Sequence, residues 1–172
     1  MSQSYRPLPP IEVLRDLLRY DSSTGQLYWR HPRSGVSTTR PAGYLYPQRN
    51  RAQIRIDGAT YRLHRVVWTM VTGEDPGGLT IDHIDRDASN NRFENLRLAT
   101  RQQQVQNRAG VGPHGLKGVS PSISKRNPWR AQIQHNRKII HLGCYATAEE
   151  AHAAYQQAAS ELFGEFACFD SK

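Results

Sequence analysis

Cysteine is scarce in this 172-residue chain, and its placement excludes two kinds of protein. The two cysteines, Cys144 and Cys168, form no CxxC pair, which excludes a cysteine-based zinc knuckle and argues against a disulfide framework. No stretch reaches the roughly 18 apolar residues that cross a bilayer, and the N-terminus lacks the apolar core of a signal peptide. We therefore expect a soluble protein of a reducing compartment, with no membrane partner.

Charged residues of each sign are absent from some segments of the chain and frequent in others. Residues 1–110 contain no lysine, but they hold sixteen arginines against ten acidic residues. Residues 115–143 contain six Lys or Arg and no acid, whereas residues 144–172 contain five acids and one lysine. The net charge of +8 and the pI of about 9.9 favour a polyanionic partner such as nucleic acid. The change of sign predicts that one segment faces this partner and the next faces away.

Local patterns divide the chain into a series of short elements. Apolar spacing predicts a helix over 11–19, and Val66 to Val71 continue as a second helix that Gly73 ends. The dipeptide Asp57-Gly58 predicts a tight hairpin, because both residues accept a positive φ. The expected strands of this first half cover 26–30, 43–47, 52–57 and a segment ending near 63.

The second half of the chain reads as two strand and helix groups joined by a hinge. Strands are expected over 79–84 and 96–99, with a polar loop between them, and Thr100-x-x-Gln103 is a capping box that opens a helix. Two glycines and a proline over 109–114 predict the hinge. Three strands are expected next, near 116–120, 129–134 and 138–143. A helix follows from Ala148 to Phe163, with Ala151, Ala154, Tyr155, Ala158 and Leu162 on its apolar face.

The pair Asp82-His83, at the end of an apolar strand, is the first candidate for a catalytic site. A half-buried carboxylate needs a partner, and a divalent ion would provide one for Asp82. A neutral His83 could then take a proton from water. Gln104 and Asn107, three apart on the capped helix, offer amide oxygens. Oxygen ligands suit Mg²⁺ or Mn²⁺ better than zinc.

Three ordered motifs around this pair resemble the phage-type HNH endonucleases. They are His64-Arg-Val-Val-Trp68, Ile81-Asp-His-Ile-Asp85 and Asn90-Asn-Arg-Phe-Glu-Asn-Leu-Arg97. The resemblance covers about residues 11–108 and implies a ββα-metal fold that cleaves DNA phosphodiesters. It implies that Asp82 and Gln104 ligate one Mg²⁺ or Mn²⁺ ion per active site, that His83 is the general base, and that Asn95 orients the imidazole. His64 is expected to be structural or to contact phosphate.

One position departs from the family pattern. The helix of the family usually has Asn where this chain has Gln104, whose amide oxygen lies one methylene further out. A displacement of about 1 Å can cost on the order of a hundredfold in rate. Asn107 is the alternative ligand. This departure leaves a catalytically weakened or inactive DNA-binding regulator as an alternative to the nuclease.

Motifs in the C-terminal segment resemble those of an AP2-type DNA-binding domain. They are Gly118-Val119, Trp129 to Ile133, His141 to Tyr145, Thr147 to Tyr155, and Phe163 to Ala167. Such a domain lays a three-stranded sheet into the major groove with its helix behind. The candidate DNA contacts are Arg126, Trp129, Arg130, Gln132, Gln134, Lys138 and His141. Arginine suits guanine, glutamine suits adenine, and Lys138 is expected to reach phosphate. Trp129 is also a candidate for the core.

Together these patterns predict an α+β fold with two domains. A strand and helix region leads into a ββα-metal nuclease core at about 64–108, within a domain over 1–110. The hinge joins it to an AP2-like domain over 115–169, a three-stranded antiparallel sheet packed on one helix. We expect a phage- or mobile-element-encoded, homing-type endonuclease in the cytoplasm of a bacterial host. As a monomer it should nick double-stranded DNA, and as a homodimer it could cut both strands. An RNA-binding structural protein would explain the charge but not the ordered Asp-His…Asn set.

Overall fold

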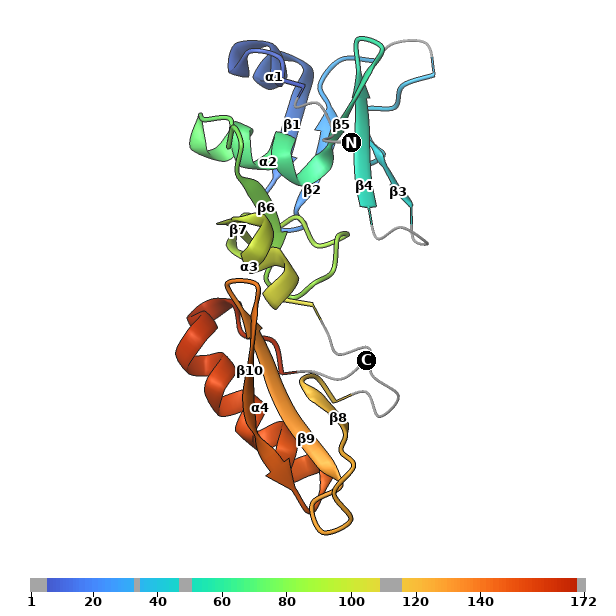
Figure 1. Ribbon diagram of the computed structural model, residues 1–172. Helices are drawn as coiled ribbons and strands as arrows, with labels where there is room; N and C mark the ends of the chain where they lie inside the picture. Colours follow the sequence, from blue (N-terminus) through green and yellow to red (C-terminus); the bar gives the residue numbers. More distant parts are fainter. Residues whose placement is uncertain (1–5, 33–34, 47–50, 109–115, 170–172) are drawn as a thin grey trace. The chain divides into compact units, whose positions relative to one another are not determined.

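The computed structural model describes residues 6–32, 35–46, 51–108 and 116–169. The chain divides into two compact units, Met1–Arg101 and Gln102–Lys172, whose elements are shown in Figure 1. This division comes before the predicted hinge at 109–114, which lies outside the described residues. Each unit is described separately below.

The first unit begins with a short helix and a hairpin. Helix α1 (Ile11–Leu17) leads into strand β1 (Leu18–Asp21), which pairs antiparallel with β2 (Gln26–Trp29). The expected helix therefore ends two residues early, because Leu18 already has extended backbone angles. Leu14 and Leu18 are fully buried, as the apolar spacing predicted.

A three-stranded antiparallel sheet follows in the order β3-β4-β5. Its strands are β3 (Tyr44–Tyr46), β4 (Arg51–Ile56) and β5 (Ala59–Arg62). The turn between β4 and β5 has φ of 46° at Asp57 and 79° at Gly58, which confirms the predicted hairpin. On β4, Ala52, Ile54 and Ile56 alternate into the core.

Helix α2 (Leu63–Thr72) packs its apolar face against this core. Val66 and Val67 are fully buried. Gly73 ends the helix with φ of 86°, in the left-handed region, and its N–H donates to the Thr69 carbonyl at 2.9 Å. The second expected helix and its glycine stop are thus confirmed.

The segment that carries the candidate site is a two-stranded antiparallel sheet. Strand β6 (Thr80–His83) pairs with β7 (Leu96–Ala99), and the 3-10 helix η2 (Phe93–Asn95) precedes β7. Helix α3 (Arg101–Gln106) follows directly. Both strands and the helix were predicted, since their signals are local.

The second unit contains a three-stranded antiparallel sheet of order β10-β9-β8 and one long helix. Its strands are β8 (Val119–Pro121), β9 (Trp129–His135) and β10 (Lys138–Tyr145). Helix α4 (Ala148–Phe163) packs on this sheet, and the 3-10 helix η3 (Gly164–Phe166) follows. A reciprocal capping box between Thr147 and Glu150 opens α4.

The buried face of α4 is rotated from the predicted one. Its buried residues are Ala148, Ala151, His152, Tyr155, Ala159 and Phe163. Leu162, expected inside, is 37% exposed, and Ala154 and Ala158 are half-buried. His152 replaces the expected apolar neighbour because both its ring nitrogens meet backbone carbonyls, those of Lys117 at 3.0 Å and Phe169 at 3.1 Å.

Two further sequence expectations concern cysteines and membranes. Cys144 and Cys168 are both free thiols, in agreement with the absence of a disulfide framework. Among the helices described, none has the length and apolar character needed to cross a membrane.

Candidate nuclease site

Asp82 and His83 lie side by side at the end of β6, and each is 9% exposed. The antiparallel register places Asp82 opposite Arg97 and His83 opposite Leu96. Because cross-strand partners point to the same face of a sheet, Asp82 and Arg97 meet. The Asp-His pair is therefore nearly buried, but at the end of a strand and next to a polar loop.

Arg97 is the partner of Asp82 that the sequence analysis missed. Its Nε and Nη2 atoms donate to Oδ2 of Asp82 at 3.1 and 3.0 Å, and both side chains are 11% exposed. Asp82 thus has a charged partner within the protein, besides the metal ion that was expected to provide one. The strand pairing itself, which sets Asp82 against Arg97, was the available signal. Loss of Arg97 would leave a buried charge with one partner fewer.

The imidazole of His83 is held by Asn91. Its Nε2 atom lies 3.0 Å from Oδ1 of Asn91, whose side chain is almost fully buried at 1% exposure. The Nδ2 atom of Asn91 donates to the carbonyls of Ala88 and Ser89, each at 3.3 Å. Because these bonds use the amide N–H groups, the carbonyl oxygen must face the histidine. Nε2 of His83 is therefore placed to donate to this oxygen.

Asn95 has a different role from the expected one. Its Nδ2 donates to Oδ1 of Asp85 at 2.9 Å and to the Asn90 carbonyl at 2.8 Å, and its Oδ1 accepts from the Asp85 N–H at 3.0 Å. The assignment of Asn95 as the group that orients the imidazole is thus wrong, since its amide is used within the loop. Asn95 fixes the loop that in turn places Asn91.

Asp85 remains charged in this loop. Burial opposes the charge, but hydrogen bonds from the Asn90 side chain, the Asp87 N–H and the Asn95 side chain outweigh it. They hold the pKa of Asp85 below its ordinary value. The anionic side chain thus organises the turn that follows His83.

His64, at the start of α2, contacts the imidazole of His83. The two rings meet edge to face, with centroids 5.1 Å apart. Burial, together with the neighbouring His83, Arg62 and Arg65, lowers the pKa of His64 to about 3. His64 is therefore neutral at physiological pH, which fits a structural role beside His83.

This shift predicts a pH-dependent stability. The folded state binds fewer protons than the unfolded chain, whose histidines titrate near 6.5. The stability that the folded state gains by keeping His64 neutral is complete above pH 6.5, and it is lost as the pH falls toward 3. We expect the melting temperature of the wild type to fall between pH 7 and pH 5 by more than that of a His64→Gln variant. Thermal denaturation measures this, with exposed His31→Gln as the control. An equal fall in melting temperature for the wild type and His64→Gln would contradict the lowered pKa of His64.

Gln104 and Asn107, the candidate amide ligands, lie at α3. Gln104 is half-buried within the helix, whereas Asn107 is buried just beyond its end, where its N–H donates to the Gln103 carbonyl at 3.1 Å. Helix α3 falls in the second compact unit.

The donor chemistry of these residues fits a hard divalent ion. No group of three or more His, Cys, Asp or Glu side chains gathers as a metal site within the described ranges. A Mg²⁺ or Mn²⁺ ion keeps several waters and takes one or two carboxylates, so it needs no such cluster. Asp82 supplies a carboxylate, which accepts on both oxygens and can be shared with Arg97. Gln104, which lies in the other compact unit, has an amide side chain.

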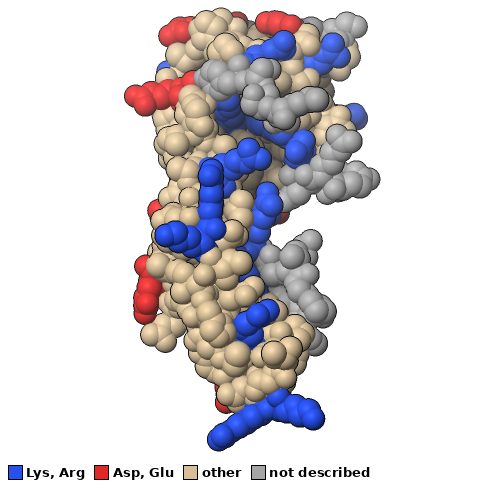
Figure 2. Space-filling view, viewed as in Figure 1, with Lys and Arg blue, Asp and Glu red and all other residues tan. Residues whose placement is uncertain are grey.

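The expected nucleic-acid contacts largely share the sheet face opposite α4. Ala131 and Ile133 are buried on the helix side, so Arg130, Gln132 and Gln134 point outward as predicted. His141 lies directly opposite Gln132 and is exposed. In Figure 2 many Lys and Arg side chains are in view, while Asp and Glu side chains stand at the margins.

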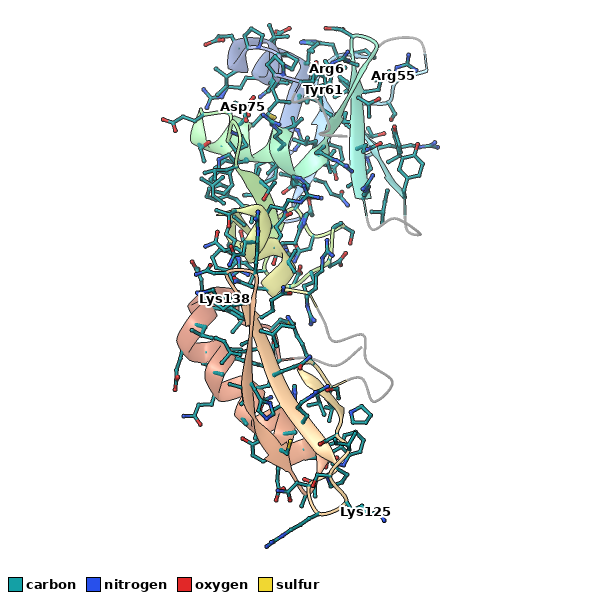
Figure 3. All side chains as sticks on the ribbon, in the orientation of Figure 1. Arg6, Arg55, Tyr61, Asp75, Lys125 and Lys138 are labelled. Atoms are coloured by element: carbon teal, nitrogen blue, oxygen red, sulfur yellow. The ribbon has the colours of Figure 1, made fainter. Side chains whose placement is uncertain are left out.

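Three of the predicted contacts lie elsewhere on this unit. Lys138 lies opposite His135, and Trp129 lies opposite Tyr145. By strand alternation, Lys138 and Trp129 are therefore on the face of the sheet that packs on α4, at opposite ends of the strands. Lys138 is exposed at the hairpin, and Trp129 is half-buried. Arg126 is exposed in the loop between β8 and β9, next to Lys125, which Figure 3 labels.

A second basic face, on β3–β5, was missed in the sequence. Arg51 and Arg55 alternate with the buried residues of β4, and Arg62 lies opposite Gln53 on the same face. Burial lowers the pKa of Arg62, and the charge of Arg51 lowers it further. The exposed rings of Tyr44 and Tyr46 border it. The alternation in Arg51 to Ile56 was the signal that could have shown it (Arg55 is labelled in Figure 3).

Comparisons with known proteins find similarity to HNH endonucleases. The family model described as HNH endonuclease matches residues 61–106. An uncharacterized HNH endonuclease of Acanthamoeba polyphaga mimivirus is 35% identical over 116 residues, which cover 66% of this chain and 59% of that protein. Protein 3.8 of Escherichia phage T7 is 35% identical over 106 residues, which cover 55% of this chain and 87% of that protein.

A solved structure is also similar over part of the chain. It is that of the HNH homing endonuclease I-HmuI, described for its DNA binding and cleavage, at 26% identity and a TM-score of 0.43, covering 58% of this chain and 55% of that one. The chain thus spans less than two thirds of the mimivirus protein and of I-HmuI.

The antiparallel strand pair with Asp-His at its end, and the short helix after it, lie within residues 61–106, which the HNH endonuclease model matches. The chain belongs to the HNH endonuclease family. It is similar to a mimivirus protein named an HNH endonuclease, and it covers most of phage T7 protein 3.8.

Proposed function

We propose that this protein hydrolyses phosphodiester bonds of double-stranded DNA with one Mg²⁺ or Mn²⁺ ion per site. The observation that carries this proposal is the hydrogen bond between Nε2 of His83 and Oδ1 of Asn91, which orients the ring at the end of β6. A histidine whose Nε2 donates to a fixed acceptor can use its other ring nitrogen as a base toward a water molecule. The buried Asp82 beside it is the candidate metal ligand, together with Gln104.

Under this proposal, each residue around His83 has a separate role in hydrolysis. His83 takes a proton from the attacking water, and Asn91 keeps its ring in the reactive orientation. Asn95 and Asp85 hold the loop that carries Asn91. Arg97 compensates the charge of Asp82. A divalent ion bound here would supply stabilisation of the negative charge on the phosphate and the leaving oxygen.

The second unit supports DNA reading by an AP2-like sheet. Its three strands and single helix have the order that the AP2 resemblance implies, and its outer face presents Arg130, Gln132, Gln134 and His141. These side chains can pair with base edges in the major groove, and Lys138 and Arg126 can reach phosphates. The basic face on β3–β5 offers a further phosphate contact in the first unit. We infer that the sheet positions the nuclease, as a monomer that nicks or a homodimer that cuts both strands.

A catalytically weakened DNA-binding regulator is the second candidate, and Gln104 favours it. The longer side chain replaces the Asn that the family usually has at this position. Such a regulator would bind DNA equally in the presence of a chelator, whereas the nuclease needs its ion for cutting.

Plasmid cleavage separates the two functions. We expect the wild type to nick supercoiled DNA with Mg²⁺ or Mn²⁺ and to stop with chelator. If Gln104 reaches the metal from one methylene too far, Gln104→Asn should cut about tenfold or more faster, within the hundredfold that 1 Å can cost. Gel analysis of the nicked and linear forms measures both. Gln156→Asn, on α4, is the matched control.

The contrary outcome is equally specific. DNA binding without cleavage, for the wild type and for Gln104→Asn and on DNA of several sources, would favour the regulator.

A further inference from the structure

The β6–β7 loop, residues 84–95, is held from outside by the β1–β2 hairpin. The residues that meet are between 69 and 73 positions apart in the chain, and all of them belong to the first compact unit. Hydrogen bonds inside the loop, such as those of Asn95, give it a shape but do not fix where it lies. The hairpin makes three separate contacts that do.

The first contact is the hydroxyl group of Tyr20 on β1, which bonds the loop backbone on both sides of Arg92. It donates to the carbonyl of Asn91 at 3.2 Å and accepts from the N–H of Phe93 at 2.9 Å. Burial raises the pKa of Tyr20 above its ordinary value, so the hydroxyl keeps its proton at neutral pH. One side chain thus pairs a backbone acceptor and a backbone donor of the loop.

The turn of the hairpin makes the other two contacts. Nε of Arg92 donates to the carbonyl of Ser23 at 2.8 Å. Gly25 lies directly against the loop backbone, because a Cβ atom there would lie 2.4 Å from N of Arg92 and 2.6 Å from C of Asn91. Its φ of 74° also favours glycine. The close approach of hairpin and loop therefore requires glycine at this position.

The hairpin is itself well fixed. Leu18 and Leu27, one on each strand, are fully buried in the core of the first unit. In the turn, Oδ1 of Asp21 accepts from the N–H and the hydroxyl of Ser23, at 3.0 and 2.7 Å. The carbonyl of Asp21 accepts from the N–H of Gly25 at 2.8 Å. A segment held by the core and by its own hydrogen bonds can position a neighbouring loop.

Asn91 connects this support to the imidazole of His83. Its backbone carbonyl accepts from Tyr20, and its side-chain Oδ1 lies 3.0 Å from Nε2 of His83. The side chain of Asn91 is nearly fully buried, so a shift of its backbone carries the amide with it. A displacement of about 1 Å at a reacting group can cost on the order of a hundredfold in rate.

We propose that Tyr20 and Gly25 are positioning residues for DNA cleavage, because they hold the backbone of Asn91 and, through Asn91, the ring of His83. The inference rests on the proposed nuclease function, in which His83 is the base. Under it, the N-terminal hairpin contributes to the rate of cutting, although its residues take no part in the chemistry.

The test uses two variants of the full chain, each with a matched control. Tyr20→Phe removes only the hydroxyl group. Its control is Tyr28→Phe, since the hydroxyl of Tyr28, on β2 of the same hairpin, donates at 2.7 Å to Gln26 of its own strand. Gly25→Ala adds the Cβ atom that meets the loop. Its control is Gly58→Ala, where φ is 79° and no atom lies within 4 Å of the added Cβ.

Three quantities are measured for each variant. They are the single-turnover cleavage rate of plasmid DNA with Mn²⁺, the dissociation constant for DNA, and the exchange of the His83 Nε2 proton with water. The last is followed by NMR of protein with isotope-labelled histidine. We expect Tyr20→Phe to cut about tenfold more slowly than Tyr28→Phe and to exchange this proton about tenfold faster, with DNA affinity within about twofold. Gly25→Ala should differ from Gly58→Ala in the same directions.

A double-mutant cycle shows whether Tyr20 acts through Asn91. Asn91→Ala removes the amide that bonds His83 and keeps the backbone carbonyl that accepts from Tyr20. If the effect passes through that amide, adding Tyr20→Phe to Asn91→Ala should slow cleavage by less than about twofold. A general loss of structure would instead slow the two backgrounds equally.

Each contrary result overturns a defined part of the inference. Unchanged proton exchange and cleavage in Tyr20→Phe and Gly25→Ala would overturn all of it. Faster exchange with an unchanged cleavage rate would overturn the link to cutting, and equal slowing in both backgrounds would overturn the path through Asn91. Absence of cleavage by the wild type would overturn the proposed function, while the exchange of the His83 proton would still decide whether the hairpin holds the ring.

Discussion

Replacement of His83 by alanine is expected to reduce metal-dependent DNA cleavage at least a hundredfold, with DNA binding retained. General base catalysis contributes roughly 10²–10⁴ to a rate. The structure supports the upper part of this range, because Asn91 holds the ring in one orientation. A freely rotating imidazole would lose part of this advantage. Single-turnover cleavage of plasmid DNA measures the loss.

Two comparisons make this expectation specific. His31→Ala removes an exposed histidine from the same unit and should leave the rate unchanged. Thermal denaturation of His83→Ala shows whether the buried site still folds, since removal of the ring leaves the carbonyl group of Asn91 without its partner. A folded His83→Ala protein that cuts at the wild-type rate would exclude His83 as the base.

Replacement of Gly118 by alanine is expected to unfold the C-terminal unit. Gly118 has φ of 79°, and a Cβ atom there would lie 2.0 Å from Cδ2 and 2.4 Å from Cγ of Tyr155. That ring cannot move aside, because Tyr155 is 3% exposed in the core of the unit, where burial raises its pKa to about 12. Overpacking typically costs about 1–3 kcal/mol, and a left-handed backbone adds about 1–2 kcal/mol for a side chain. We expect a loss of about 3 kcal/mol or more.

Gly164→Ala is the matched control for this substitution. Gly164 also has a positive φ, of 53°, but no atom lies within 4 Å of the position of its Cβ. It should therefore lose only what its backbone conformation, with φ of 53° and ψ of −125°, costs a side chain. Urea denaturation followed by Trp129 fluorescence measures both variants, and Gly118→Ala should also bind DNA more weakly. Equal losses in the two variants would show that the close approach to Tyr155 is not what demands glycine.

The elements of this fold could be predicted from sequence because their signals are local. The left-handed turn at Asp57-Gly58, the capping box at Thr147 and the alternation in β9 each depend on a few adjacent residues. The Asp-His pair could be found for the same reason, since strand and motif coincide. The buried face of α4 was predicted less well, because the pattern cannot show that a histidine will meet two carbonyl groups.

The partners within the site could not be predicted in the same way. The pairing of Asp82 with Arg97 depends on the register of two strands separated by a twelve-residue loop, Ile84 to Asn95. The choice of Asn91 over Asn95 depends on the path of that loop, in which several asparagines are equally good turn residues. The resemblance to the HNH family drew attention to the Asp-His pair, but it assigned the orienting amide to Asn95, whereas the side chain of Asn91 bonds the ring.

The exposure of α3 also bears on how such enzymes diverge. None of its side chains is fully buried, and Gln104 is half-buried, so a substitution there disturbs the core of the protein little. Under the proposed function, selection on this position would act through DNA cleavage. The amino acid at 104 should then vary among relatives together with their cutting activity.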